Sequence, residues 1–193
     1  MRTICVYCGS GVGANKKYRE AAVELGKEIA SRDLTLVYGG GNIGLMEVLA
    51  TTVLAGGGKV IGVIPKGLFS LNLAKKNITQ LIVAKDMHER KAIMSNLSDA
   101  FIALPGGIGT LEEFAEAVTW NQLHIHQKPC GILNVNGYFN HLIDFLNHSV
   151  KEKFFKVSER NLIVIDKEPK TLLKKLSLRK VLKASKNWEE ILE

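Results

Sequence analysis

Short runs of apolar residues alternate along this chain with longer stretches in which apolar residues recur at helical spacing. The short runs predict buried strands, and the longer stretches predict amphipathic helices. The expected strands cover residues 3–8, 35–38, 60–64, 80–84, 100–104, 130–133 and 162–165. The expected helices cover residues 18–31, 44–55, 87–96, 139–152 and about 169–193, with another that runs from a Thr110 cap to residue 123 and an irregular segment at 66–77.

This alternation of strands and helices predicts the fold class. Parallel strands need helical crossovers, and continuous apolar strands are typical of a sheet that is covered on both faces. We therefore expect an α/β protein with a doubly wound, Rossmann-like and mostly parallel sheet of about seven strands, with helices on both faces. All 193 residues are expected to form a single domain, because the chain is too short for two α/β cores.

Glycine-rich turns follow several of the expected strands, at the sheet edge where doubly wound folds bind ligands. Two turns, at residues 9–14 and 39–44, match the pattern Gly-x-Gly-x-x-Gly/Ala of dinucleotide-binding proteins. Neither is followed by the acidic residue that a nicotinamide enzyme needs for the ribose, and no P-loop pattern occurs. We therefore expect these turns to hold a phosphate and a sugar rather than NAD. The residues expected to bind substrate here are Gly9, Ser10, Gly39, Gly40 and Asn42.

A third glycine turn lies within residues 104–113, Leu-Pro-Gly-Gly-Ile-Gly-Thr-Leu-Glu-Glu. Its glycines permit close approach of the backbone, and Thr110 is expected to cap the helix that follows. The free N–H groups and the dipole at a helix start favour an anion, so we expect a phosphate here. The residues of this turn expected to hold substrate are Gly106, Gly107, Ile108, Gly109, Thr110, Leu111 and Glu112.

Charged residues are expected beside these turns. Arg90 and Lys91 follow Met87 at the start of a helix, where a guanidinium can clamp a phosphate or carboxylate, although both could also be ordinary helix-surface residues. Glu113 is a candidate catalytic carboxylate. The spacing Thr110-x-x-Glu113 is also that of a capping box, in which Glu113 would only bind the helix start.

Composition excludes some classes of protein. The net charge of +7 would suit a nucleic-acid binder or a protein that handles phosphorylated small molecules, but much of it lies among leucines at helical spacing near the C-terminus. A solvated amphipathic helix is therefore favoured over nucleic-acid binding.

No apolar run of about 20 residues and no signal-peptide pattern occurs, so we expect a cytoplasmic protein without a membrane partner. Three cysteines, with Cys5 and Cys8 in one strand, predict structural thiols rather than disulfides or a metal site.

Taken together, these motifs resemble those of a known family. Met-His-Glu-Arg-Lys at residues 87–91, followed by Pro-Gly-Gly-x-Gly-Thr-x-x-Glu at 105–113, resembles the paired signature of the LOG family. The members of this family are cytokinin riboside 5'-monophosphate phosphoribohydrolases, often labelled lysine decarboxylases. The resemblance includes the turns after the first two strands and the third strand, and it covers roughly residues 3–165.

The resemblance implies hydrolysis of the N-glycosidic bond of AMP or an N6-substituted adenosine 5'-monophosphate, giving free base and ribose 5-phosphate. By analogy, Arg90 and Glu113 form the catalytic pair, and Met87 and Lys91 help to hold the substrate. The resemblance also implies a homodimer. No cofactor is expected, since nothing marks a lysine for pyridoxal phosphate. Asn72 stands where plant members usually carry a substrate-contacting Glu, which leaves open the preference between plain and prenylated AMP.

Two other classes of function remain as alternatives. A non-catalytic nucleotide-binding protein, or a molybdenum cofactor carrier, would use the same pocket without chemistry. An RNA-binding protein would use the basic C-terminal helix and would bind in a strongly salt-dependent way. Release of free base from a nucleoside monophosphate separates the hydrolase from both.

Overall fold

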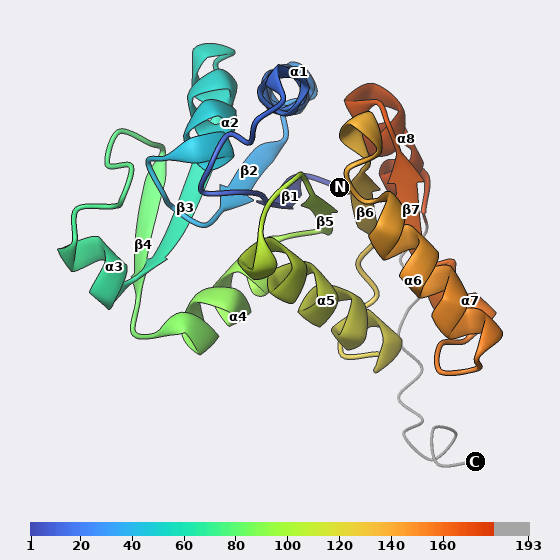
Figure 1. The fold of residues 1–193 in the computed structure, drawn as a ribbon. Helices are drawn as coiled ribbons and strands as arrows, with labels where there is room; N and C mark the ends of the chain where they lie inside the picture. The colour runs from blue at the N-terminus through green and yellow to red at the C-terminus, as the bar shows by residue number, and fades with distance from the viewer. Residues whose placement is uncertain (180–193) are drawn as a thin grey trace.

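A computed structural model of the chain describes residues 1–179 and shows one seven-stranded sheet (Figure 1). The strand order is β4-β3-β2-β1-β5-β6-β7, and every neighbouring pair is parallel. The strands are β1 (Thr3–Tyr7), β2 (Thr35–Tyr38), β3 (Lys59–Pro65), β4 (Gln80–Ala84), β5 (Ala100–Ala103), β6 (Cys130–Leu133) and β7 (Ile163–Asp166). This confirms the predicted doubly wound parallel sheet.

Helices cover both faces of the sheet and form two separate apolar cores. The helices are α1 (Lys16–Ser31), α2 (Gly44–Ala55), α3 (Lys66–Ser70), α4 (Met87–Leu97), α5 (Ile108–Gln122), α6 (Asn140–Lys151), α7 (Val157–Arg160) and α8 (Pro169–Leu178), with a 3-10 turn, η1 (Val135–Gly137). Helices α1, α2 and α8 pack on one face, and α4, α5 and α6 pack on the other. Cys5 and Cys8 are buried free thiols in opposite cores, as predicted for structural cysteines.

Most bounds differ from the sequence-based expectation by one or two residues, the short helix α7 was not expected, and two differences bear on the candidate site. The segment expected to be irregular contains the short helix α3, which follows Pro65 directly. Helix α5 begins at Ile108 with Gly107 as its N-cap, so the prediction that Thr110 caps this helix is wrong. Glycine is tolerated at an N-cap but carries no side chain that would mark the position in the sequence. The expected C-terminal helix is present as α8, and its predicted continuation from residue 180 to 193 lies outside the described residues.

The chain order reverses at β1, which pairs with β2 on one side and β5 on the other. In doubly wound sheets such a switch point opens a crevice at the carboxyl ends of the strands. Main-chain hydrogen bonds connect the turns around this point. The Gly9 amide donates to the Pro105 carbonyl at 3.0 Å, and the Leu45 amide donates to the Gly9 carbonyl at 3.0 Å. Gly44 has a φ of +62°, and a Cβ there would lie 2.2 Å from the carbonyl carbon of Ser10. These contacts explain why glycines recur at this edge.

Among residues 1–179, no helix is both long enough and apolar enough to cross a bilayer.

Candidate active site

A buried arginine lies at the carboxyl edge of the sheet. Arg90 belongs to α4, which starts at an Asp86 cap that accepts the Glu89 amide at 2.9 Å. The Arg90 side chain runs inward, where Nε donates to the Val63 carbonyl at 3.0 Å and Nη1 donates to Glu113 Oε1 at 2.6 Å. With only 9% of its surface exposed, Arg90 is not an ordinary helix-surface residue.

Glu113, on α5, is the buried partner of this arginine. Its side chain is 13% exposed, and its carboxylate is bound by the guanidinium rather than by the start of its own helix. The capping-box alternative is therefore wrong. Burial raises the pKa of the Glu113 carboxyl, and the neighbouring Arg90 charge offsets part of that rise. Burial and the Arg90 charge therefore act on the Glu113 carboxyl in opposite directions.

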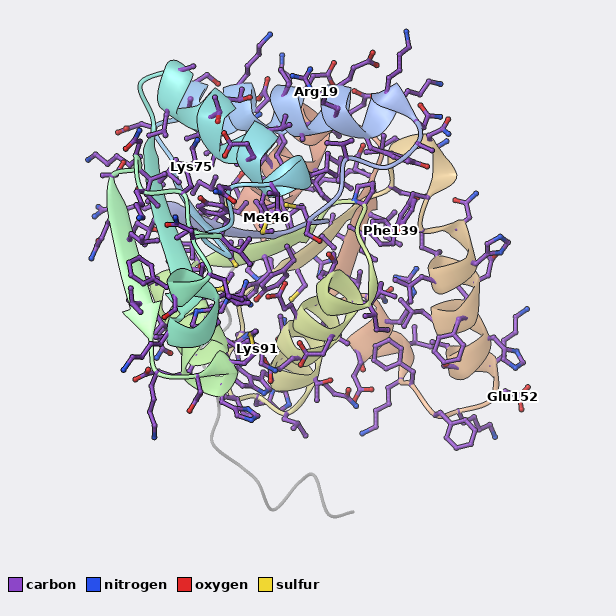
Figure 2. The ribbon with its side chains drawn as sticks, turned by 60° about the vertical axis from the view of Figure 1, so that its left-hand side comes forward. Arg19, Met46, Lys75, Lys91, Phe139 and Glu152 are labelled. Carbon is purple, nitrogen blue, oxygen red and sulfur yellow. The ribbon has the colours of Figure 1, made fainter. Side chains whose placement is uncertain are left out.

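The turn after β2 packs against the Arg90 guanidinium. A Cβ on Gly39 would lie 2.2 Å from Arg90 Nη2 and 3.3 Å from Met46 Sδ, so only glycine fits without displacing the arginine. Met46, labelled in Figure 2, belongs to the first turn of α2. The predicted site residues Gly39, Arg90 and Glu113 are therefore brought into direct contact from three different elements.

A second ion-pair cluster lies next to the first. Lys91, 11% exposed, pairs with both Glu112 and Glu116 of α5, the latter at 3.0 Å. Pairing with Glu112 raises the pKa of the Lys91 ammonium. Lys91 and Glu112, both predicted to bind substrate, thus bind each other in this structure. Arg90 and Lys91 are adjacent in α4, and their ion pairs connect this helix to α5.

A cavity of about 330 Å³ lies at the turns that follow β1 and β5. No side chain of the described residues caps the start of α5, so its first N–H groups remain available to an anion. Thr110 lies beneath the turn, where a Cβ on Gly106 would meet its Oγ1 at 2.1 Å. The cavity is lined by Gly9, Ser10, Gly11, Val12, Gly13, Tyr18, Leu45, Pro105, Gly106, Gly107 and Tyr138, none of them charged.

Two tyrosines of this cavity were missed by the sequence analysis. Tyr138 Oη donates to the Gly106 carbonyl at 2.5 Å and so fixes the glycine turn. Its ring meets that of Tyr18 edge to face, with 5.4 Å between centroids. The signal that could have identified Tyr138 is its place in a glycine-containing turn directly after β6, at the same edge as the other turns.

Asn42 and Asn72 lie apart from the Arg90–Glu113 pair, in a polar cleft of about 520 Å³ that Lys75 and Lys76 also line. Asn72 has a φ of +61°, a left-handed conformation that asparagine adopts more readily than glutamate. Its side chain accepts a hydrogen bond from Lys76 Nζ at 3.0 Å. The backbone conformation thus offers a physical reason for asparagine at this position.

The other predicted site residues are spread along the same edge. Met87 lies beside the guanidinium, with 3.3 Å between its Sδ and Arg90 Nη1. Ile108 is 83% exposed at the start of α5. Gly40 has a φ of +73° and packs on β3, whereas a Cβ on Gly109 would meet nothing within 4 Å. The glycine turns and the Arg90–Glu113 pair thus lie at one edge of the sheet, but Arg90 and Glu113 do not line the cavity of the Gly9 and Gly106 turns, and Asn42 lines a separate cleft.

The fold and these contacts define a doubly wound α/β protein with glycine-rich turns and a buried arginine–carboxylate pair at one edge of its sheet. The model of the family described as "Possible lysine decarboxylase" matches residues 46–176. A probable cytokinin riboside 5'-monophosphate phosphoribohydrolase of Oryza sativa subsp. japonica, LOGL6, is 52% identical over 175 residues, which cover 91% of this chain and 70% of that protein. The chain therefore belongs to the LOG family, as the motifs indicated.

Other relatives agree with this assignment. The cytokinin riboside 5'-monophosphate phosphoribohydrolase LOG1 of Arabidopsis thaliana is 47% identical over 192 residues, covering 97% of this chain and 90% of that protein. Among solved structures, the molybdenum cofactor binding protein of Rippkaea orientalis has a TM-score of 0.70 and 26% identity, covering 91% of this chain and 95% of its own. The molybdenum cofactor carrier protein of Chlamydomonas reinhardtii, at a TM-score of 0.69 and 21% identity over 92% of this chain and 99% of its own, shares the fold.

Proposed function

We propose that this protein hydrolyses the N-glycosidic bond of AMP or N6-substituted adenosine 5'-monophosphates, giving free base and ribose 5-phosphate. The observation that carries the proposal is the contact between Arg90 and Glu113, at 2.6 Å, at the same sheet edge as the glycine turns that line a cavity. Relatives 47–52% identical to the chain are named phosphoribohydrolases of cytokinin riboside 5'-monophosphates, which supports the same reaction and substrate class here.

The chemistry of the pair suits this reaction. Cleavage of a glycosidic bond passes through an oxocarbenium-like state, which a carboxylate beneath the sugar stabilises. The ionised Glu113 carboxylate can also orient or deprotonate the attacking water. Arg90 cannot donate a proton, because a guanidinium has a pKa above about 12, so we assign it hydrogen bonding to the substrate and control of the Glu113 charge.

The charge of the surrounding cluster supports the same assignment. Arg90 and Lys91 face the three carboxylates of Glu112, Glu113 and Glu116, so the cluster has one negative charge more than it has positive charges. A surplus negative charge favours a sugar on which positive charge develops. The phosphate of the substrate would instead lie at the uncharged amides of the Gly9 and Gly106 turns.

We also propose that the protein is a homodimer that pairs through the outer face of α5 and α6. An apolar groove of about 320 Å³ runs between these helices, and Phe154 at its end is 87% exposed. Exposed apolar surface of this kind marks interaction sites, and a two-fold pairing would bury the groove against its own copy. Sedimentation should give twice the 21.2 kDa of one chain, and Phe154→Asp should give monomers. A monomeric unsubstituted protein would contradict the proposal.

The activity is tested by incubating the protein with AMP and with isopentenyladenosine monophosphate and separating the products by chromatography. Free adenine or isopentenyladenine is expected, and Glu113→Gln should abolish its release while AMP binding stays measurable. Intact nucleotide in both reactions at high protein concentration would refute the hydrolase. Tight binding of a pterin nucleotide without release of base would instead support the carrier alternative. The cytoplasmic location expected from the sequence stays a prediction.

A further inference from the structure

Lys91 occupies a position between α4 and α5 that the proposed reaction does not yet explain (Figure 2). Its ammonium pairs with Glu112 and Glu116, which lie four residues apart on one side of α5. Glu113, the next residue after Glu112, is directed instead to Arg90. Arg90 and Lys91, which are adjacent in α4, therefore bind carboxylates on two different sides of α5.

We propose that Lys91 is a positioning residue that fixes the first turns of α5, so that the Glu113 carboxylate stays on Arg90, and that it does not hold the nucleotide itself. The proposal rests on the function proposed above, because it concerns the geometry of the same carboxylate. It assigns to Lys91 a role different from the substrate contact that the family resemblance implies.

The contacts of Lys91 carry this assignment. An ammonium has three donors, and two of them are used by carboxylates of α5. The side chain is nearly as buried as that of Arg90, at 11% against 10% exposure. To reach a phosphate, Lys91 would have to break both ion pairs and leave Glu112 and Glu116 with uncompensated charge. Rotation of α5 about its axis would break the pairs with Lys91 or the pair with Arg90, so together they hold the helix in one orientation.

The charges around Glu113 make this role measurable. The charged and titratable groups that influence Glu113 are Arg90 and Lys91 from α4, Glu112 from its own helix, Cys5 and Tyr7 from β1, and Cys8 just after β1. The Lys91 charge lowers the pKa of the Glu113 carboxyl, whereas the Glu112 charge raises it. Removing Lys91 and removing Glu112 should therefore shift this pKa in opposite directions. These shifts report the charges at Glu113, whereas kcat and the Kd for AMP report the role of Lys91.

The experiment compares Lys91→Gln and Glu112→Gln with the unsubstituted protein. The pKa of Glu113 is measured by NMR of the full chain with 13C-labelled glutamate. The Kd for AMP is measured by calorimetry, and kcat is measured from the release of adenine. We expect a higher pKa in Lys91→Gln and a lower pKa in Glu112→Gln. In Lys91→Gln, kcat should fall by about 10- to 100-fold, the effect of a small displacement of a catalytic group, while the Kd for AMP changes by less than about 3-fold. Lys175→Gln, which removes a 2.7 Å ion pair with Asp166 far along the chain, is the matched control and should change none of these values.

A 10-fold weaker Kd for AMP with kcat retained would overturn the inference and make Lys91 a substrate ligand, and so would an unchanged kcat. If Lys91→Gln does not fold, the double substitution Glu112→Gln with Glu116→Gln takes its place. It should lower kcat similarly without weakening AMP binding, and a retained kcat there would overturn the inference as well. Absence of adenine release by the unsubstituted protein would contradict the proposed function, whereas the Kd for AMP in Lys91→Gln separates a positioning residue from a substrate ligand without turnover.

Discussion

Substitution of Gly39 by alanine tests whether the position of Arg90 controls catalysis. The added Cβ would lie 2.2 Å from Arg90 Nη2, where an ordinary contact needs about 3.5 Å, so the guanidinium must move by about 1.3 Å. Although this atom ends a flexible side chain, the Val63 carbonyl and the Glu113 carboxylate hold it in place. The shift would stretch the 2.6 Å contact with Glu113 beyond hydrogen-bond distance.

The expected loss follows from that displacement. A hydrogen bond to a charged group contributes about 1.5–3 kcal/mol, and alanine restores about 0.4–1 kcal/mol by restricting the unfolded chain. We therefore expect Gly39→Ala to lower the free energy of unfolding by about 1–2 kcal/mol. Because a displacement of about 1 Å can cost about 100-fold in rate, kcat should fall by about two orders of magnitude.

Urea unfolding and adenine release measure the two effects separately. Gly67→Ala is the matched control, because a Cβ at Gly67 would meet nothing within 4 Å. It should keep kcat and leave the free energy of unfolding unchanged or higher by up to about 1 kcal/mol. A Gly39→Ala protein with kcat within 3-fold of the unsubstituted value would show that the placement of Arg90 does not matter. An equal loss in Gly67→Ala would show that the effect is not local.

Further predictions concern the pH profile, the glycine turn and the thiols. Because burial raises the pKa of Glu113 and the reaction needs its carboxylate, kcat/KM should fall as the pH is lowered, with a midpoint above 4.5; a midpoint at or below that value would contradict the assignment. Tyr138→Phe removes the hydroxyl that donates to the Gly106 carbonyl, so the Kd for AMP should rise about 5- to 10-fold in calorimetry while kcat changes little. Burial raises the pKa of the Cys130 thiol to about 12, and Cys5 and Cys8 are equally enclosed, so Ellman's reagent should label these thiols only after unfolding.

Much of the fold could be predicted because the apolar pattern and the architecture agree. Strands β2, β4 and β6 and helix α2 have the bounds that the sequence predicts, since each is a continuous run that ends at glycine, charged or polar residues. The start of α5 could not be located, because its N-cap is Gly107 and the nearby threonine imitates a capping signal. Helix α3 has only five residues, too few to show a helical period.

The sequence predicts which residues form the candidate site but not which of them contact one another. Placing the turns at one sheet edge follows from parallel strands, so Arg90 and the 106–113 stretch were expected there. Which cation meets which carboxylate depends on the rotation of α4 and α5 about their axes, and the sequence does not determine that rotation. Spacing alone therefore left the choice between a capping box and an ion pair open at Glu113, and only the 2.6 Å contact with Arg90 decides it. Tyr138 was missed because it acts through a main-chain carbonyl 32 residues away.

The distribution of charge also orients the substrate. The ion-pair cluster of α4 and α5 carries a surplus negative charge, whereas the cavity behind the Gly106 turn offers N–H dipoles and no charged side chain. A phosphate bearing up to two negative charges is repelled by the cluster and attracted by the start of α5. The sugar, which gains positive charge in the reaction, has the opposite preference. We therefore propose that a nucleotide binds with its phosphate at the start of α5 and its glycosidic bond toward Glu113.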